Sequence, residues 1–153
     1  MIRKILLTLT LLAIATQASA AHFASLRSDK VFLREGPTYQ HRVLFTYKRK
    51  DYPIEVLAAY ESWRRVRDVD GTTGWISQTM MSDLRTVLVV GKTSAELRAA
   101  PDAMASVLAR AEPGVVGRLK ACKPQFCEIS ASGLTGWIDR TRIWGVSAGE
   151  IYP

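Results

Sequence analysis

The sequence predicts an all-β protein built of two tandem small β-barrels that follow an N-terminal signal peptide. Short apolar runs of strand length alternate with Gly, Pro and charged clusters. A six-residue phrase occurs twice, as Gly-Thr-Thr-Gly-Trp-Ile at 71–76 and as Gly-Leu-Thr-Gly-Trp-Ile at 133–138. No stretch after the first 20 residues keeps a helical period. The repeated unit is therefore expected to be a β-unit.

Residues 1–20 are predicted to be a secretory signal peptide. Arg3 and Lys4 precede an apolar run, 5–15, which ends near the small-residue triplet 18–20. The run is too short for a membrane anchor, because crossing the hydrocarbon core takes roughly 20 apolar residues. We therefore expect an exported protein, periplasmic or secreted, with no membrane span in the mature chain.

The mature chain carries a mild positive charge. Removing residues 1–20 leaves 133 of the 153 residues, enough for one ordinary domain or two very small ones. The formal charge of +7 falls to +5 when Arg3 and Lys4 are removed. This excess favours anionic neighbours such as cell-wall polymers or lipid head groups, although solubility alone also explains it. Nucleic acid is not expected as a partner, because an exported chain with no recognised binding motif suits it poorly.

Cys122 and Cys127 are the only cysteines of the chain. In an exported protein, an even pair this close is expected to form a disulfide, which would pin one hairpin. The alternatives are a redox-active pair and a catalytic thiol. A redox pair usually has two residues between its cysteines, whereas Lys-Pro-Gln-Phe lies between these. We therefore expect a structural disulfide.

The repeat extends well beyond the opening phrase. Three pairs of segments match in the same order: 33–37 with 97–101, 63–66 with 126–129, and 74–76 with 136–138. The offset shrinks from 64 to 63 to 62 residues, which places single deletions in connecting loops, where length changes are best tolerated. We therefore divide the mature chain into two copies of one unit, 21–85 and 86–153.

The strands of the first copy are predicted from runs bounded by Gly, Pro or charged residues. In chain order these runs are 31–34, 43–47, 54–59, 63–68 and 74–77, and 86–90 begins the second copy. The strongest hairpin signal is an Asp-Gly turn within 68–74. Residues 77–82 are predicted to contain one tight turn of 3₁₀ helix. Five or six short strands imply a strongly bent barrel, because an open sheet of this size would leave both edges unpaired.

Three motifs recur in a fixed order: Leu-Arg-x-x-Pro at 33–37, Trp-x-x-Val at 63–66, and Gly-x-x-Gly-Trp-Ile at 71–76. Together they resemble the bacterial SH3-like domain, and the mature chain resembles the exported two-repeat proteins of Gram-negative bacteria built from it. The resemblance implies two SH3-like β-barrels. The second copy has Ala99-Ala100 in place of Glu-Gly and Phe in place of Trp, which weakens its expected binding role more than its fold.

Trp63, Arg65 and Arg67 are predicted to form a binding surface on the first copy. If Val66 faces the barrel interior, strand alternation places these three side chains on the opposite face. An aromatic ring beside two guanidinium groups suits stacking on a sugar or peptide and holding a carboxylate. The resemblance adds that eukaryotic SH3 domains bind extended peptides with an outward Trp at a similar strand position. The alternative is that a bulge turns Trp63 inward as a core residue.

Tyr39 and Tyr47 flank the loop 35–42, where a groove wall is expected. In the second copy the corresponding outward residues are Phe126 and Glu128, with no Arg pair. Any binding groove is therefore expected to be stronger in the first copy.

Other aromatic and basic residues are given structural roles. Trp75 and Trp137 are expected in the core or between the repeats. The glycines of the two repeated phrases are expected at turns or at close backbone approaches. Lys48-Arg49-Lys50 is expected to be a solvated loop tip.

Catalysis, metal binding and cofactors are not expected. A cysteine peptidase needs a thiolate beside a general base, yet the only histidines, His22 and His41, lie in the first copy and both cysteines in the second. The chain has too few His and Cys residues for a zinc site. Two tiny barrels also offer little depth for the carboxylate pair of a glycosidase.

The sequence therefore favours a non-catalytic, exported, tandem SH3-like binding module. The resemblance implies a cell-envelope ligand such as peptidoglycan or its peptide stems, contacted by Trp63, Arg65 and Arg67. The alternative is a periplasmic adaptor that docks another protein through exposed strands or the tail 149–153. The polymer hypothesis predicts salt-sensitive binding, and the adaptor hypothesis predicts a discrete stoichiometric complex.

Overall fold

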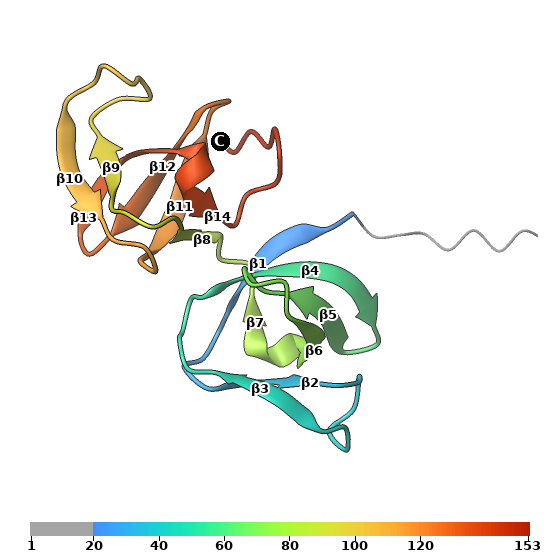
Figure 1. Cartoon of the computed structure of the whole chain (residues 1–153). Helices are drawn as coiled ribbons and strands as arrows, with labels where there is room; N and C mark the ends of the chain where they lie inside the picture. Colours follow the sequence, from blue (N-terminus) through green and yellow to red (C-terminus); the bar gives the residue numbers. More distant parts are fainter. Residues whose placement is uncertain (1–19) are drawn as a thin grey trace, which may run out of the picture.

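The computed structural model describes residues 20–153, so the predicted signal peptide lies outside the described residues except for Ala20. The described chain forms two seven-stranded antiparallel sheets, one after the other along the sequence (Figure 1). The first unit contains β1 (His22–Leu26), β2 (Val31–Arg34), β3 (Val43–Tyr47), β4 (Pro53–Tyr60), β5 (Trp63–Arg67), β6 (Thr73–Ser77), η1 (Gln78–Met80) and β7 (Met81–Ser82). The second unit contains β8 (Thr86–Val89), β9 (Ala95–Arg98), β10 (Val107–Ala111), β11 (Val116–Cys122), β12 (Phe126–Ala131), β13 (Leu134–Asp139), η2 (Arg140–Arg142) and β14 (Ile143–Trp144).

The two sheets have the same strand order. It is β3-β2-β6-β5-β4-β1-β7 in the first unit and β10-β9-β13-β12-β11-β8-β14 in the second, so each strand of one unit has its counterpart in the other. The sequence repeat is therefore a repeat of topology, and the prediction of an all-β chain with two tandem units is confirmed. None of the described residues form a helix long and apolar enough to cross a membrane.

The strand predictions hold closely, with one omission. β2 and β3 have the predicted bounds, and the bounds of β4, β5, β6 and β8 differ from prediction by no more than one residue at either end. β1 was not predicted from the sequence. Its residues 23–26 are all buried, because Phe23 faces the second unit while Leu26 lies in the core. A strand covered on both faces shows no alternation of apolar and polar residues.

Each sheet encloses its own hydrophobic core. The inward side chains are apolar and occupy matching strand positions in the two units. They include Leu26, Leu33, Val66 and Ile76 in the first core and Val89, Leu97, Ile129 and Ile138 in the second. The alternation that places Val66 inside also determines which side chains of β5 face outward.

The glycine before each repeated Trp-Ile permits a close approach between two strands. A Cβ atom added at Gly74 of β6 would lie 2.6 Å from the Cγ atom of Leu33 and 2.8 Å from the carbonyl oxygen of Arg34, both in β2. A Cβ atom added at Gly136 of β13 would lie 3.1 Å from the Cβ atom of Leu97 in β9. The expectation that these glycines serve close backbone approach is confirmed.

Trp75 and Trp137 belong to neither core, contrary to expectation. The isoleucine after each Trp is a core residue, so strand alternation sends the two indole rings to the outer faces, where both are half-buried. There Trp75 is paired across strands with Arg34, and Trp137 with Arg98. Each tryptophan is therefore the cross-strand partner of the arginine that occupies the same position in its unit.

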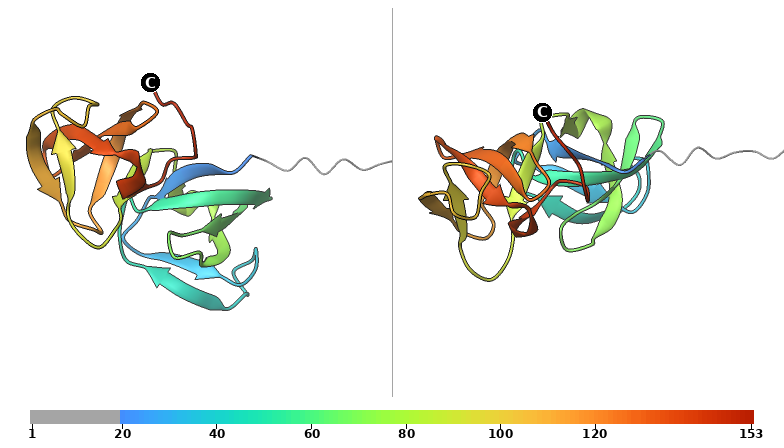
Figure 2. Two further views of the ribbon diagram at one scale, coloured as in Figure 1. Left: turned by 45° about the horizontal axis from the view of Figure 1, so that its top comes forward. Right: turned by 90° about the horizontal axis from the view of Figure 1, so that it is seen from above.

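The two units contact each other through residues other than Trp75 and Trp137. The Phe23 ring of β1 lies edge-on to the Trp144 ring of β14, with 5.0 Å between the ring centres. The Thr86 hydroxyl of β8 donates a hydrogen bond of 2.7 Å to the carbonyl oxygen of Asp51. Figure 2 shows the units side by side in both of its views.

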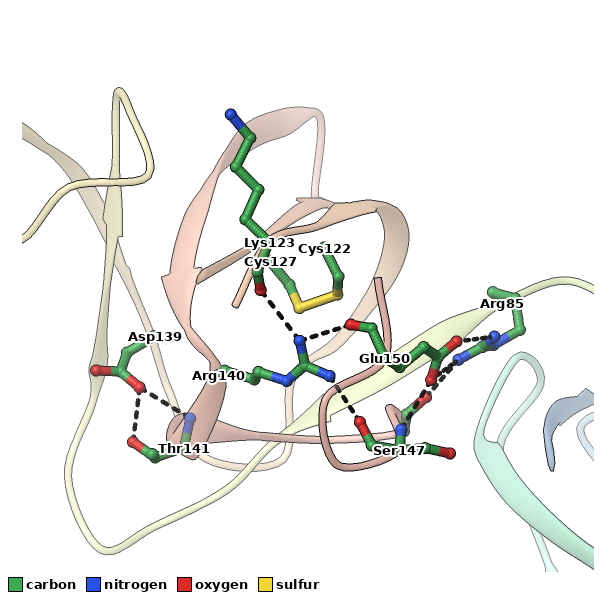
Figure 3. Close-up of a disulfide and its surroundings, with 10 residues drawn as sticks. Arg85, Cys122, Lys123, Cys127, Asp139, Arg140, Thr141, Ser147 and Glu150 are labelled. Atoms are coloured by element: carbon green, nitrogen blue, oxygen red, sulfur yellow. Dashed lines mark hydrogen bonds and ion pairs between the residues drawn. A yellow bond between two sulfur atoms is a disulfide. The ribbon is translucent and has the colours of Figure 1, made fainter. Parts of the chain in front are cut away.

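A disulfide joins Cys122 to Cys127 and closes the β11–β12 hairpin, as the sequence predicts (Figure 3). Both cysteines are buried in the core of the second unit. The C-terminal segment lies against the same hairpin, because Cys122 and Tyr152 exchange two backbone hydrogen bonds of 2.8 and 3.3 Å. The last residues of the chain are thus added to the edge of β11.

Replacing Gly74 by Ala is expected to destabilise the first unit more than Gly136→Ala destabilises the second. The new methyl group meets its nearest neighbour at 2.6 Å in one case and 3.1 Å in the other, and overpacking typically costs about 1–3 kcal/mol. Gly74→Ala should therefore lie at the upper end of that range. Urea unfolding followed by tryptophan fluorescence measures both losses. Equal losses would contradict this account of the two glycines.

Candidate functional site

The outer face of the first unit carries a pocket of about 290 Å³, which we call the aromatic pocket. Its lining combines three aromatic rings with two cations. The lining residues are Lys30, Phe32, Arg34, Tyr39, Trp63, Ser77 and Met80. None of them is acidic, so the positive charges are not neutralised within the lining.

β2 contributes two side chains to the pocket because its residues alternate. Val31 and Leu33 lie in the core, which sends Phe32 and Arg34 to the outer face. The preceding Lys30 places its Nζ atom 5.5 Å from the ring centre of Phe32, within the range of a cation–π interaction. One strand thus supplies an aromatic ring together with a positive charge.

Trp63 lies on the strand face opposite Val66, as alternation predicts. Val66 is part of the core cluster, whereas Trp63 is not. Its side chain is nonetheless only 6% exposed, because the Tyr39 ring lies edge-on to it with 4.9 Å between ring centres. In the β4–β5 hairpin, the register shifts between Val56 and Ala58 of β4, so alternation within β5 is unbroken. Trp63 therefore forms the floor of the pocket.

Arg34 holds the loop 35–42 that brings Tyr39 to the pocket. Its Nη1 atom donates hydrogen bonds to the carbonyl oxygens of Tyr39 at 3.1 Å and His41 at 2.9 Å. The guanidinium also lies 5.6 Å from the ring centre of Tyr39 and 5.7 Å from that of Phe32. Since Tyr39 is 66% exposed, its ring is the part of the pocket that a ligand meets first.

Arg65 and Arg67 do not line the aromatic pocket, although they share a strand face with Trp63. Both are exposed. Arg67 forms hydrogen bonds of 2.7 and 2.9 Å with Glu55 of the neighbouring strand, so its charge is already paired. The cations nearest to Trp63 in the pocket are supplied instead by β2 and the residue before it.

Tyr47 is a core residue and not a groove wall. It is 6% exposed, and its hydroxyl donates a hydrogen bond of 2.9 Å to the carboxylate of Asp68. Burial and this bond raise the pKa of Tyr47 far above its ordinary value of 10. Asp68 also accepts the backbone N–H groups of Asp70 and Thr72. Tyr47 therefore ties β3 to the β5–β6 turn from inside the unit.

The second unit has a pocket at the matching position, with different chemistry. Its volume is about 360 Å³, and its lining residues are Ser94, Glu96, Arg98, Ala103, Arg110, Phe126, Asp139 and Arg142. Ala103 stands where the first unit has Tyr39, and Glu96 where it has Phe32. Glu96 forms ion pairs with Arg98 and with Arg110, the latter at 3.2 Å. The exposed aromatic ring is thus missing here, and two of the three arginines are paired with Glu96. The third, Arg142, donates to the carbonyl oxygens of Val90 and Thr93.

Sequence reasoning missed five of the residues that line the pocket: Lys30, Phe32, Arg34, Ser77 and Met80. The signal for two of them was present, because the alternation argument applied to β5 places Phe32 and Arg34 outward when applied to β2. Nothing in the sequence indicated that the loop would fold back to set Tyr39 upon Trp63, since that depends on hydrogen bonds made by Arg34.

Other chemistries have little support in the described part of the chain. Within residues 20–153, no group of three or more His, Cys, Asp or Glu side chains is placed to hold a metal ion. Both cysteines are joined in the disulfide. His41 shares a hydrogen bond of 2.8 Å with the hydroxyl of Thr38 in the pocket loop.

Comparison with known proteins identifies the two units. A family model of the bacterial SH3 domain matches residues 27–83 and again residues 91–145. The solved structure of NlpC2 from Trichomonas vaginalis is 15% identical over 85% of this chain and 51% of that one, with a TM-score of 0.37. For NlpC1 from the same organism the values are 16%, 87%, 50% and 0.38. The chain thus spans about half the length of these two structures. No curated protein matches it.

Tyr47→Phe is expected to lower the free energy of unfolding at pH 7 by about 1–2 kcal/mol, because it removes one partner of a buried hydrogen bond. The raised pKa of Tyr47 means that the folded state keeps this hydroxyl protonated. Its contribution to stability is complete below the ordinary pKa of 10 and declines as the pH rises above it.

The loss of stability above pH 10 should therefore be shallower in Tyr47→Phe than in the unaltered protein. Urea unfolding at several values between pH 8 and 11 measures the slope. Val66→Ala, which lowers stability without removing a titratable group, serves as the control and should leave the slope unchanged. Identical slopes in all three proteins would show that Tyr47 does not behave as described.

Proposed function

The chain belongs to the bacterial SH3 domain family, and on that premise we propose that it is a non-catalytic, exported module that binds a component of the cell envelope. The proposed ligand is peptidoglycan or its peptide stems, and the proposed site is the aromatic pocket. The observation that carries this proposal is the exposed Tyr39 ring, which lies upon Trp63 beside Arg34 and Lys30.

The chemistry of the pocket suits a ligand that joins sugar or peptide groups to carboxylates. Aromatic rings offer flat apolar faces for sugar C–H groups and for peptide planes. Arg34 already uses one nitrogen to hold the loop, while the exposed Lys30 ammonium is available to attract a carboxylate. Peptidoglycan presents both kinds of group in one polymer.

The first unit is the better binder in this proposal. Its pocket keeps three aromatic rings and two cations, whereas the pocket of the second unit pairs its glutamate with two arginines. Ion pairs inside a lining leave less charge for a ligand and must be broken or desolvated when one binds. The second unit is therefore assigned a supporting role.

The absence of catalysis is part of the proposal. Both cysteines are committed to the disulfide, which removes the thiolate that a peptidase requires. His41 lies in the pocket loop, where its ring shares a hydrogen bond with the hydroxyl of Thr38. Export rests on the N-terminal pattern of the sequence, where a basic pair precedes a short apolar run.

The test is retention of the protein on purified peptidoglycan sacculi at low and high salt. Tyr39→Ala should weaken binding about tenfold, equivalent to about 1.4 kcal/mol, because it removes the exposed ring. Lys30→Glu should weaken it at least as much at low salt, and the difference should shrink at high salt as charges are screened. Lys48→Glu makes the same charge change on an exposed loop outside the pocket and should bind normally.

Two results would contradict the proposal. One is equal weakening by Lys30→Glu and Lys48→Glu, which would indicate attraction by overall charge alone. The other is no retention of the unaltered protein in either salt condition. Circular dichroism of each variant shows whether the fold is intact before binding is compared.

A further inference from the structure

The first unit also has an open groove at one end of its barrel. Its volume is about 380 Å³. The lining residues are His22, Ala24, Arg27, Val56, Ala58, Ala59, Arg64, Gln78, Met81 and Asp83. None of the seven residues that line the aromatic pocket is among them, although Arg64, Gln78 and Met81 directly follow residues of that pocket in the chain.

The same end of the second unit is filled by the C-terminal tail of the chain. Tyr152 forms a two-bond backbone bridge with Cys122, and its side chain packs against the second core. The carboxylate of Glu150 accepts bonds of 2.6 and 3.2 Å from Arg85 (Figure 3). These bonds outweigh the effect of burial and hold the pKa of Glu150 below its ordinary value.

Arg140 is the second arginine that binds the tail. Its guanidinium donates to the carbonyl oxygens of Lys123 at 3.0 Å, Glu150 at 2.7 Å and Ser147 at 2.6 Å. It thus joins the disulfide hairpin to the tail, as Figure 3 shows. The tail turns at residues 147–150 and then runs to its bridge at Tyr152. The end of the barrel binds it through that backbone bridge and two arginines, one of which pairs with the carboxylate of Glu150.

The groove of the first unit is the counterpart of this tail site. Ala24 of β1 pairs with Ile54 of β4, and Val87 of β8 pairs with Gly117 of β11. Each residue of the first pair thus has its counterpart 63 residues later in the second pair. By the same offset, His22 matches Arg85, Ala59 matches Cys122 and Arg64 matches Cys127. Gln78, the first residue of η1, matches Arg140, the first residue of η2. Each residue that holds the tail therefore has its equivalent in the groove lining.

The edge of β4 in the groove can form the same kind of backbone bridge that Cys122 forms with the tail. β4 continues to Tyr60, but its pairing with β1 ends at Val56 and His22. Within residues 20–153, no strand pairs with this edge of β4 beyond Val56. Since Cys122 directs its N–H and C=O groups to the tail, the matching Ala59 is expected to direct its own groups into the groove.

The charge of the groove favours an acidic occupant. Arg27 and Arg64 stand at positions where the second unit has Val90 and Cys127, and Asp83 is the one acidic residue of the lining. Arg64 donates a bond of 2.7 Å to Gln78 at the edge of the groove. A neutral partner of this kind is readily exchanged for a carboxylate, which binds guanidinium more strongly.

We propose that the open groove binds an extended acidic peptide of a partner protein, which adds as a short strand to β4 at Ala59. The peptide would bind as the tail binds the second unit. Arg27 and Arg64 of the groove would favour a peptide with negative charge. Such strand addition uses backbone hydrogen bonds for affinity and side-chain contacts for specificity. The proposal does not depend on the function proposed for the aromatic pocket.

The probe is the synthetic peptide Ser-Ala-Gly-Glu-Ile-Tyr-Pro, which copies residues 147–153. It is titrated into the ¹⁵N-labelled mature protein while amide resonances are followed. Binding should shift the amides of residues 58–60 and the side-chain resonances of Arg64 and Gln78. Replacing Glu by Gln in the peptide should weaken binding about tenfold, because a charge-assisted bond is lost.

Matched variants separate the groove from the rest of the surface. Ala59→Pro removes the N–H donor at an exposed strand edge, where proline is tolerated, and should weaken binding at least tenfold. Ala59→Gly retains the donor and should bind within about twofold of the unaltered protein. Tyr39→Ala should leave peptide binding unchanged, so failure of this proposal is distinguishable from failure of the one above.

Three results would overturn the proposal. The first is the absence of shifts at millimolar peptide. The second is shifts confined to the surroundings of Cys122, which would mean that the peptide only exchanges with the chain's own tail. The third is a concentration-dependent shift of Ala59 without peptide that disappears on deletion of residues 149–153, which would assign the groove to a second copy of this chain.

Discussion

Both units depend on one close approach between strands, made possible by the glycine before each Trp-Ile pair. At Gly74 the backbone of β6 comes so near to β2 that a methyl group would overlap Leu33. The arginine that follows Leu33, Arg34, pairs across strands with Trp75 at this approach. Arg34 bonds to the loop that follows, and in the second unit Arg98 makes the equivalent bond to Ala105 at 2.8 Å. In both units the arginine at the close approach thus also holds the loop at the rim of the pocket.

The two units share their interior and differ at their surfaces. Inward positions must fill the same space, so a change of volume there is costly. Outward positions are free of that constraint, which allows Tyr39 and Phe32 to have Ala103 and Glu96 as counterparts without change of strand order. The same freedom leaves one barrel end open and the other covered by the tail. The two units therefore share one strand order and carry different outer surfaces.

The sequence predicted what depends on local pattern and missed what depends on distant partners. β2 and β3 were found because apolar runs end at Gly, Pro or charged residues, and the Cys122 disulfide because spacing and export both favour it. Tyr47 was misplaced, because its hydroxyl bonds to Asp68, which lies 21 positions later in the sequence and is not linked to it by any local pattern. Arg67 was assigned to the binding surface, although Glu55 lies beside it across the hairpin. Side-chain pairing between strands requires the register, and alternation alone does not give it.

Arg85 contacts both the first unit and the C-terminal tail. It belongs to the short link between the units, lies 6.0 Å from the ring centre of Phe23 in the first unit, and bonds to Glu150 in the tail. Displacing Glu150 would leave the Arg85 guanidinium, which is 17% exposed, without its carboxylate partner, so the charge that binds the tail would become an uncompensated cost beside Phe23.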